Sequence, residues 1–560
     1  MKQKVAKYIA DFFAEHGIEH IFTITGGGAM HLNDAFGHHS SLHCVYNHHE
    51  QACAIAAEGY TRLTGRIAPV CVTSGPGGTN ALTGVVGAWL DSIPMFVVSG
   101  QVKRETTIHA AGAPDGLRQL GDQEFDIVSC VRSMTKYAVQ IWNAEEIRYH
   151  LEKAWYLALN GRGGPVWLDI PLDIQAAIVE TDTLKGFADS ASVTESTTPA
   201  RNNPPYDKSL TPQIVGQLKN AKRPVLMLGT GVRLANAHKE VLRLAEILQI
   251  PVVTAWNAHD LVTDENPLYC GRPGTIGLRG GNFVVQNSDL LIVLGCRLNI
   301  RQISYSYSTF AKNAYKIIVD IDEKELQKPT IHPDLPINAN LKDVVDDLLS
   351  CKLPVVPVKW LEWCKNVHNK YPATLPQYYE KKKPLNPYVF IKEFTSFLND
   401  DETIICGNGS ACVITFQAGI IKENTRLFTN SGSATMGYGF PAAIGCCFAK
   451  NAFAPSKERV ICIDGDGSFQ MNLQELQTVA YHQPNLKIIY LNNSGYHSMR
   501  QTQNNLFQPP LVGVSKESGV SFPSAEKIAA AYDIPFMRVE ILEDIKTLIE
   551  FIKKEGHAIC

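Results

Sequence analysis

Residues 459–493, RVICIDGDGSFQMNLQELQTVAYHQPNLKIIYLNN, decide the fold. The apolar runs 459–463 and 486–491 are typical of buried strands, and apolar residues recur at helical spacing between them. A strand–helix–strand unit of this kind places its two strands parallel in one sheet, and the side chains that follow the strands then emerge at the same sheet edge. We therefore expect Asp466 and Asn493, which follow the first and the second strand, to lie close together.

These two residues suit a magnesium ion. Mg²⁺ prefers hard oxygen ligands and usually combines one or two protein groups with phosphate oxygens. Asp466 supplies a carboxylate and Asn493 an amide oxygen, while the helix that follows points its N-terminal amides at the same place, which favours a diphosphate. Gly465 and Gly467 let the backbone approach closely. The alternative interpretation is structural, with an Asp cap and an Asn turn and no ligand.

The same alternation of short apolar runs and helical patterns fills three stretches of the chain. It predicts an α/β fold of three doubly wound parallel-sheet domains, at 1–181, 213–350 and 389–560. Stretches rich in Ser, Thr, Asn and Pro at 182–212, and in Pro at 351–388, are predicted linkers. Further predicted strands are IFTI, APVCVTS, PMFVVSG and PVWLDI in the first domain, RPVLMLG, PVVTAW, DLLIVLG and KIIVDID in the second, and TIICGNG in the third.

Composition excludes several classes of protein. The chain is 45% hydrophobic and 19% charged with a net charge of −3, a globular profile without a basic stripe, so neither disorder nor nucleic-acid binding is expected. The apolar runs are shorter than a bilayer span and no signal peptide precedes the first domain, which favours a soluble, cytoplasmic protein without membrane contact. The 14 cysteines form no C-x-x-C pair and are expected to be reduced core residues.

Four motifs carry a resemblance to a known family: GDGS with a strand-final NN, ITGGGAMHL (24–32), NHHEQACAIAAEGYTRLTG (47–65) and TSGPGGTNALTGVVGAWLDSIP (73–94). They resemble the signatures of thiamine-diphosphate-dependent enzymes, and the whole chain is similar to the acetohydroxyacid (acetolactate) synthase large subunits. The resemblance implies a pyrimidine-binding, a central and a diphosphate-binding domain. It also implies that Asp466, Asn493 and the backbone carbonyl of Gly495 bind Mg²⁺.

Glu50 resembles the glutamate that hydrogen-bonds N1′ of the aminopyrimidine and so activates the cofactor. Gly27 precedes it at the family's spacing. Without the neighbouring motifs, Glu50 would be interpreted as a favourable first-turn charge on a helix. His48 and His49, beside it, are interpreted as structural groups of the preceding turn, and the alternative is that one of them acts as an acid/base at the reaction adduct.

The third domain supplies the other cofactor contacts that the resemblance implies. In SGSATMGYGFPAAIG (431–445), Met436 matches the apolar residue that bends the cofactor, and Ala434 would offer its carbonyl to the 4′-amino group. The remaining implied contacts are Asn408, Gly409, Ser410, Gly467, Ser468 and Tyr496.

The substrate segments depart from the family pattern. A stretch after Gln101 is longer than in the synthases and reaches Gln123, which matches a polar residue near the substrate, as does Lys136. Position 502 is Thr where the synthases carry a Trp that screens the acceptor. The surrounding SGYHSMRQTQ looks more like a branch found in polysaccharide and deoxysugar gene clusters.

We therefore predict a carboligase that decarboxylates a 2-keto acid, pyruvate, and transfers the two-carbon unit to a carbonyl acceptor such as a keto-sugar nucleotide. The alternatives are acetolactate synthase proper, a simple 2-keto acid decarboxylase or oxidase, and an inactive homologue. The resemblance implies a homodimer or homotetramer with active sites between subunits. GTGV (229–232), GTIGLRGG (274–281), GCRLNIR (295–301) and VDID (319–322) resemble flavin-contacting turns, which leaves FAD open as a further cofactor.

Overall fold

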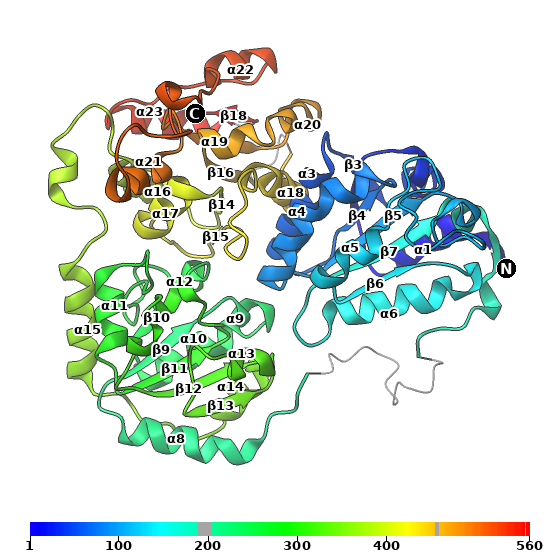
Figure 1. Ribbon diagram of the computed structural model, residues 1–560. Helices are drawn as coiled ribbons and strands as arrows, with labels where there is room; N and C mark the ends of the chain where they lie inside the picture. The colour runs from blue at the N-terminus through cyan, green and yellow to red at the C-terminus, as the bar shows by residue number, and fades with distance from the viewer. Residues whose placement is uncertain (189–202, 454–457, 555) are drawn as a thin grey trace.

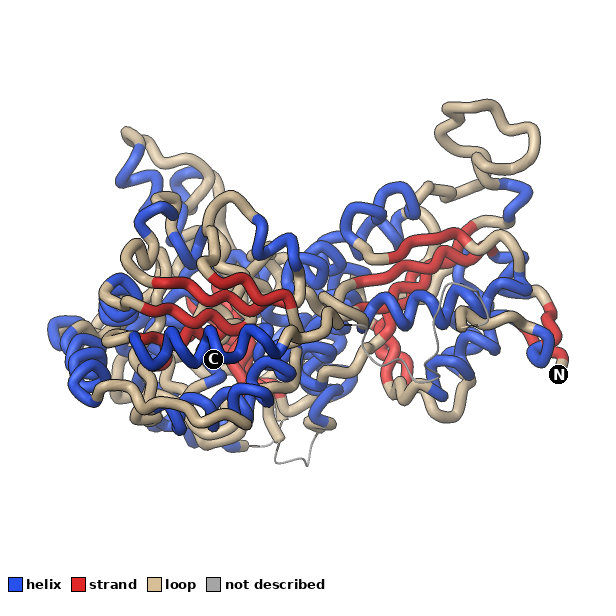
Figure 2. Tube along the Cα trace, turned by 90° about the horizontal axis from the view of Figure 1, so that it is seen from below, coloured by secondary structure: helices blue, strands red, loops and turns tan. Residues whose placement is uncertain are grey.

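The computed structural model describes residues 1–188, 203–453, 458–554 and 556–560. The predicted linker 182–212 therefore lies partly outside the described residues. Three parallel sheets, each flanked by helices, form three separate layers of structure (Figures 1 and 2). The predicted α/β class with three doubly wound domains is confirmed.

The first sheet has six parallel strands in the order β3-β2-β4-β5-β7-β6. The strands are β2 (His20–Thr23), β3 (His43–Tyr46), β4 (Pro69–Val72), β5 (Met95–Gln101), β6 (Tyr137–Gln140) and β7 (Pro165–Pro171). The helices are α1 (Val5–Glu15), α2 (Met30–Gly37), α3 (Glu50–Thr64), α4 (Pro76–Asp91), α5 (Ile127–Val131), α6 (Ile147–Leu159) and α7 (Leu172–Ala176). A small antiparallel pair, β1 (Lys2–Lys4) with β8 (Ile178–Glu180), joins the two ends of this domain.

The central sheet has five parallel strands in the order β10-β9-β11-β12-β13. They are β9 (Pro224–Leu228), β10 (Val252–Thr254), β11 (Leu290–Leu294), β12 (Tyr315–Asp320) and β13 (Leu335–Asn338). The helices are α8 (Thr211–Asn220), α9 (Gly231–Leu234), α10 (His238–Leu248), α11 (Arg279–Gln286), α12 (Ile300–Ile303), α13 (Glu323–Gln327), α14 (Leu341–Leu349) and α15 (Val358–Lys370). Helix α15 packs against α11 and leads toward the third domain (Figure 1).

The third sheet also has five parallel strands, in the order β15-β14-β16-β17-β18. They are β14 (Thr403–Cys406), β15 (Arg426–Phe428), β16 (Val460–Gly465), β17 (Leu486–Leu491) and β18 (Ala558–Ile559). The helices are α16 (Pro387–Phe397), α17 (Gly409–Ala418), α18 (Gly439–Lys450), α19 (Asp466–Gln470), α20 (Leu476–His482), α21 (His497–Leu506), α22 (Ala525–Ala531) and α23 (Asp544–Lys553). The predicted pair of adjacent parallel strands, β16 and β17, is confirmed.

Helices α3 and α18 pack closely and join the first domain to the third (Figure 1). Glycines make the approach feasible, because a Cβ on Gly59 would lie 2.5 Å from the carbonyl oxygen of Ala442, and one on Gly445 would lie 1.9 Å from that of Ala56. Apolar side chains on both sides of this contact belong to one continuous buried cluster. The two domains that carry the predicted cofactor residues therefore share a core.

Within the described residues, no helix combines the length and apolar character needed to cross a bilayer.

Candidate functional site

In each sheet the strand order reverses at a point where two Gly-rich turns meet, the usual place for a ligand in a doubly wound fold. In the third sheet this point lies between β14 and β16. A Cβ on Gly407, which follows β14, would lie 1.8 Å from Oδ1 of Asp464 at the end of β16. Only glycine fits there. Burial raises the pKa of the Asp464 carboxyl to about 7.

The Asp466 carboxylate is fixed by backbone amides at this sheet edge. Its Oδ2 accepts hydrogen bonds of 3.0 Å from the N–H groups of Asn493 and Gly495, and its Oδ1 accepts one of 2.8 Å from Gly467. Burial raises the pKa of this carboxyl, and the three N–H groups act in the opposite direction. Since a carboxylate offers about four acceptor positions, room remains for one further partner.

The donor set suits a hard cation. Hydrogen bonds from their backbone N–H groups bring Asn493 and Gly495 next to Asp466, the carboxylate with which the resemblance groups them as Mg²⁺ ligands. The part of the chain that the structure describes holds no group of three or more His, Cys, Asp or Glu placed to bind a metal. A metal at Asp466 would thus depend on amide, carbonyl and phosphate oxygens, which is the preference of Mg²⁺ rather than of Zn²⁺.

The other predicted contacts of the third domain gather around this carboxylate. A Cβ on Gly467 would lie 2.3 Å from the Tyr496 ring and 3.4 Å from the terminal methyl group of Met436, so these three residues touch. Ser468 Oγ accepts a 2.9 Å hydrogen bond from the N–H of Gly437. The predicted cofactor site of the third domain is therefore formed by the turns after β14, β16 and β17 together with the segment before α18.

The segment after β14 faces the same space. Asn408 donates from Nδ2 to the carbonyl of Ala434 at 3.0 Å, and the hydroxyls of Ser410 and Ser498 lie 3.4 Å apart. Gly409 has a φ of +62°, a conformation that favours glycine. The Ala434 carbonyl predicted to receive the 4′-amino group thus already accepts one hydrogen bond and has a second lone pair available.

Glu50 begins α3, which follows β3, the edge strand of the first sheet. It is half-buried, and its Oε2 accepts a 3.0 Å hydrogen bond from Nδ2 of Asn80. Gly27 borders open space, since a Cβ there would meet nothing within 4 Å. The neighbouring turns are tight, with the N–H of Gly28 donating to Thr73 Oγ1 at 3.0 Å. Glu50 lies in the first turn of a helix, as the sequence indicates, and His49 caps this helix by accepting from the N–H of Gln51.

The turn around Glu50 also contacts the third domain of the same chain. Glu475 accepts from Asn47 Nδ2 and from the N–H of His48, both at 2.9 Å. Asn472 donates to Gln51 at 3.3 Å and to the carbonyl of Gly437 at 2.7 Å. Among the described residues, no hydrogen bond joins Glu50 itself to the residues of the predicted metal site of its own chain.

The long segment before α5 is organised by Glu124, which the sequence analysis did not single out. Its buried carboxylate accepts hydrogen bonds from the N–H groups of Ile108, Leu120 and Gly121, and so closes residues 108–121 into a loop. The adjacent Gln123 is exposed with a φ of +62°. Lys136 donates from Nζ to the carbonyls of Asn160 and Arg162, which ties it to a turn of the first domain.

A cavity of about 540 Å³ opens at the central switch point, where all three domains meet. Turns 229–231, 295–299 and 319–321 line it from the central domain, together with Arg62 and Arg426 from the other two domains. The predicted turn 274–281 and Arg301 are not among its lining residues; instead, the N–H of Thr275 bonds to the Arg301 carbonyl at 2.9 Å. Of the two arginines in GCRLNIR, Arg297 lines the cavity and Arg301 does not.

Asn80 is a further candidate site residue, and the sequence did not predict its contact with Glu50. It lies inside the quoted SGPGGTN segment, one turn into α4. A polar amide there, opposite a carboxylate on the neighbouring α3, was the available signal. Periodicity alone cannot show which residues of two adjacent helices face each other.

Comparison with known proteins gives matches to three domain models. Residues 3–128 match the N-terminal TPP-binding domain of thiamine pyrophosphate enzymes, residues 212–348 their central domain, and residues 407–560 their C-terminal TPP-binding domain. The two TPP-binding models cover Glu50 and Asp466 respectively.

Relatives match over nearly the whole chain. The acetolactate synthase isozyme 1 large subunit of Escherichia coli K12 is 31% identical over 99% of this chain and 92% of its own length. A probable acetolactate synthase large subunit of Methanocaldococcus jannaschii is 32% identical over 97% of this chain and 88% of its own. The acetolactate synthase large subunit of Lactococcus lactis is 30% identical over 96% and 88%.

Proposed function

Since the chain belongs to the thiamine-pyrophosphate-dependent, C–C bond-forming enzymes of the acetolactate synthase large-subunit type, we propose that it decarboxylates pyruvate and joins the two-carbon unit to a second 2-keto acid. With pyruvate as acceptor, two pyruvates yield one acetolactate and one CO₂. The observation that carries the proposal is the Asp466 carboxylate, held by the amides of Asn493 and Gly495 in a chain that matches the synthases nearly end to end.

The residues at the third sheet edge fit thiamine diphosphate and Mg²⁺. Asp466, Asn493 and the Gly495 carbonyl would hold the metal, and Asn408, Ser410 and Ser468 would face the diphosphate. When bound, the cofactor supplies the electron sink for decarboxylation. Met436 and Tyr496 would exclude water beside it, because both pack against Gly467.

Glu50 would hold a proton against the ring nitrogen of the aminopyrimidine. Asn80 donates a hydrogen bond to this carboxylate and so orients it. The open space beside Gly27 leaves room for a flat ring. A carboxyl group fixed in this way suits proton transfer to a bound base. Gln123 would reach the substrate from the adjoining loop.

The complete site would form between two chains, giving a homodimer or a homotetramer. In support, the hydrogen-bond partner of Glu50 belongs to its own domain, and the third-domain residues beside it, Asn472 and Glu475, occupy the neighbouring turn. A second chain would then place the sheet edge that carries its own Asp466 close to Glu50.

FAD is proposed for the central cavity. The glycines at 229, 231 and 295 let the two turns that line the cavity pack against each other, and Arg297 supplies a cation for a diphosphate. Absorption at flavin wavelengths in the purified protein, reduced when Arg297 is replaced, is the expected result.

A second candidate acceptor is larger than a keto acid, such as a keto-sugar nucleotide. The observation that favours it is Thr502, which is exposed on α21, a helix that contributes no buried residue. Its hydroxyl donates to the carbonyl of Ser498, one turn before and beside Ser410. A small polar side chain at this position leaves the acceptor side of the site wide and accessible to water.

Incubation with isotopically labelled pyruvate tests both candidates. The proposal expects CO₂ release and labelled acetolactate from pyruvate alone, both lost with Glu50→Gln. If acetolactate forms only slowly while a keto-sugar nucleotide acquires the labelled two-carbon unit, the second candidate replaces the first. CO₂ release without any condensed product would contradict both and indicate a decarboxylase.

A further inference from the structure

Residues 429–437 form the loop that carries Ala434 and Met436 into the cofactor site, and we call it the cofactor loop. Two of its residues have left-handed backbone conformations, Ala434 with a φ of +53° and Gly437 with a φ of +86°. A left-handed alanine costs free energy, so the surrounding structure must hold it in place. Within the third domain, the carbonyl of Asn430 accepts from the N–H of Ala434 at 2.9 Å, Asn408 donates to the carbonyl of Ala434, and Ser468 Oγ accepts from the N–H of Gly437.

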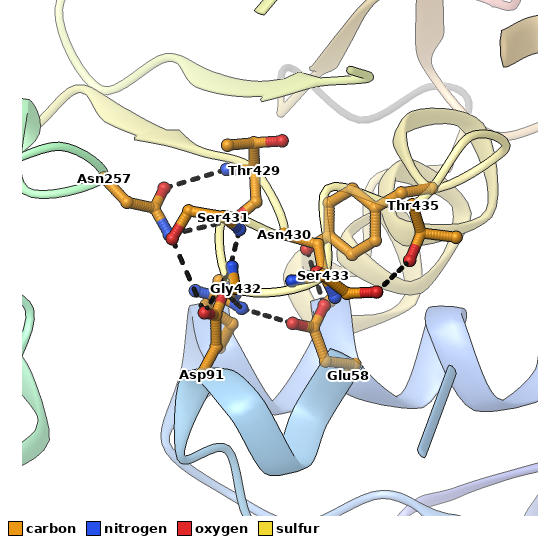
Figure 3. Close-up of polar contacts among 12 residues, drawn as sticks. Glu58, Asp91, Asn257, Thr429, Asn430, Ser431, Gly432, Ser433 and Thr435 are labelled. Carbon is orange, nitrogen blue, oxygen red and sulfur yellow. Dashed lines mark hydrogen bonds and ion pairs between the residues drawn. The ribbon is translucent and has the colours of Figure 1, made fainter. Parts of the chain in front are cut away.

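The central domain holds the start of the cofactor loop through one side chain. Asn257, which is 5% exposed, accepts from the N–H of Thr429 at 2.9 Å and donates to the carbonyl of the same residue at 2.8 Å (Figure 3). A side-chain amide that satisfies both backbone groups of one residue fixes its position and its orientation.

The first domain holds the next two residues. Asp91, the last residue of α4, accepts from the N–H of Ser431 at 3.0 Å and from that of Gly432 at 2.9 Å (Figure 3). Arg62 holds the carboxylate from the opposite side at 2.9 Å. A Cβ on Gly432 would lie 2.7 Å from Oδ1 of Asp91, so glycine is needed for this approach.

The C-terminal end of the cofactor loop is also held by a side chain of the first domain. The hydroxyl of Tyr438 donates to the buried carboxylate of Glu58 on α3. The loop is thus held at both ends by side chains that belong to other domains, and third-domain groups hold the residues between them, with Asn408 donating to the carbonyl of Ala434. Hydrogen bonds to a buried charge are among the stronger ones in proteins.

We infer that Asp91 and Asn257 are positioning residues, which hold the cofactor loop in the conformation that receives thiamine diphosphate before the cofactor arrives. The inference rests on the proposed function only in taking thiamine diphosphate as the ligand. Both residues line the central cavity, and their hydrogen bonds to the cofactor loop go to the backbone of Thr429, Ser431 and Gly432, through which they act. Preorganisation of this kind raises affinity because the ordering of the loop is not paid for on binding.

Calorimetric titration with thiamine diphosphate and Mg²⁺ is the direct test. Asp91→Asn and Asn257→Gly should each raise the Kd about tenfold, since each removes hydrogen bonds that order the loop. Glycine is chosen at 257 because that position has a φ of +68°. Asp289→Asn is the matched control: its carboxylate likewise accepts from two consecutive backbone N–H groups, those of Lys222 and Arg223, but far from the cofactor loop.

A purely structural role would lower the melting temperatures of Asp91→Asn and Asp289→Asn alike and leave both affinities unchanged. That outcome would overturn the inference, as would a KM for pyruvate, measured at saturating cofactor, that rises as much as the Kd. The expected outcome is that Asp91→Asn raises the Kd for thiamine diphosphate and Asp289→Asn does not.

Hydrogen exchange of the unaltered protein gives a second test that no folding defect can obscure. Backbone amides of residues 429–437 should be protected without cofactor and gain little protection when it is added. Full exchange in the absence of cofactor, followed by protection on its addition, would overturn the inference. Failure of the proposed function is distinguishable, because it would appear as unaltered protein that binds no thiamine diphosphate or releases no CO₂ from pyruvate.

Discussion

The central and third sheets have the same strand order, yet they present opposite charges at the same place. In both, the second strand in space is the first in sequence, and the ladder pairs Leu228 with Leu294 in one sheet and Cys406 with Ile463 in the other. Gly-Thr-Gly follows Leu228, and Gly-Asn-Gly follows Cys406. Three positions beyond Leu294 lies Arg297, and three positions beyond Ile463 lies Asp466.

On the proposed function, one backbone arrangement would serve two kinds of ligand. Arg297 lines an open cavity and suits an anion, whereas Asp466 is held by three backbone amides and suits a cation. The glycine turns are common to both sheets and supply only the close approach of the backbone. The residue after the turn decides which ligand is bound.

The largest effect is expected from Asp466→Ala. The variant removes the carboxylate of the metal site and leaves three N–H groups without their acceptor, so the affinity for thiamine diphosphate with Mg²⁺ should fall about 10³-fold. Calorimetric titration measures it. The equivalent change in the central sheet, Arg297→Ala, should leave this affinity unaltered. Equal losses in both variants would break the comparison.

Glu50→Gln should separate cofactor binding from cofactor activation. The amide keeps the shape of the side chain but cannot hold the proton, so kcat for CO₂ release should fall about 10²- to 10³-fold. The Kd for thiamine diphosphate should change little, because the diphosphate is held at the third sheet.

Glu15→Gln, on the exposed end of α1, is the control. An affinity loss in Glu50→Gln as large as the loss of kcat would show that Glu50 acts in binding instead.

Arg297→Ala tests the central half of the comparison. Loss of one cation that faces a diphosphate should weaken FAD binding about tenfold, which quenching of flavin fluorescence measures. Arg301→Ala is the matched variant, since that arginine is exposed and outside the lining of the cavity. Equal effects of the two variants, or none, would contradict an anion site at Arg297.

The smallest effect concerns Asp320, which ends β12 beside the central cavity. Burial raises the pKa of its carboxyl to about 6, so the folded protein keeps the proton at pH values where the unfolded chain has lost it. Stability should therefore fall as pH rises from about 4 to 6 and then level off.

Asp320→Asn should flatten this slope in urea denaturation of the central domain. An unchanged slope would show that another group titrates there.

Strands inside the sheets were predictable from sequence, and most edge strands were not. PVLML of β9 and LLIVL of β11 are fully buried apolar runs, and such runs signal a strand buried on both faces. HCVY of β3, YAVQ of β6, LPIN of β13 and RLF of β15 lie at sheet edges or are only partly buried. Their mixed composition resembles that of loops.

The site shows the same division. Asp466 and Asn493 could be brought together because strand adjacency follows from one crossover along the chain. Asp91 and Asn257 could not, because they act on residues more than 170 positions away, through contacts between domains that no local pattern encodes. Glu124 was overlooked for a related reason: its partners are backbone amides, which leave no trace in side-chain chemistry.

The outer edge of the third sheet has one more consequence. Beyond β15, the N–H of Leu427 donates to Asp260, and both backbone groups of Thr429 bond to Asn257, so two central-domain side chains stand in for a sixth strand. An edge covered in this manner offers no template for pairing with other molecules. Without the central domain, the third domain would expose these backbone N–H and C=O groups without partners. We expect the isolated third domain to self-associate.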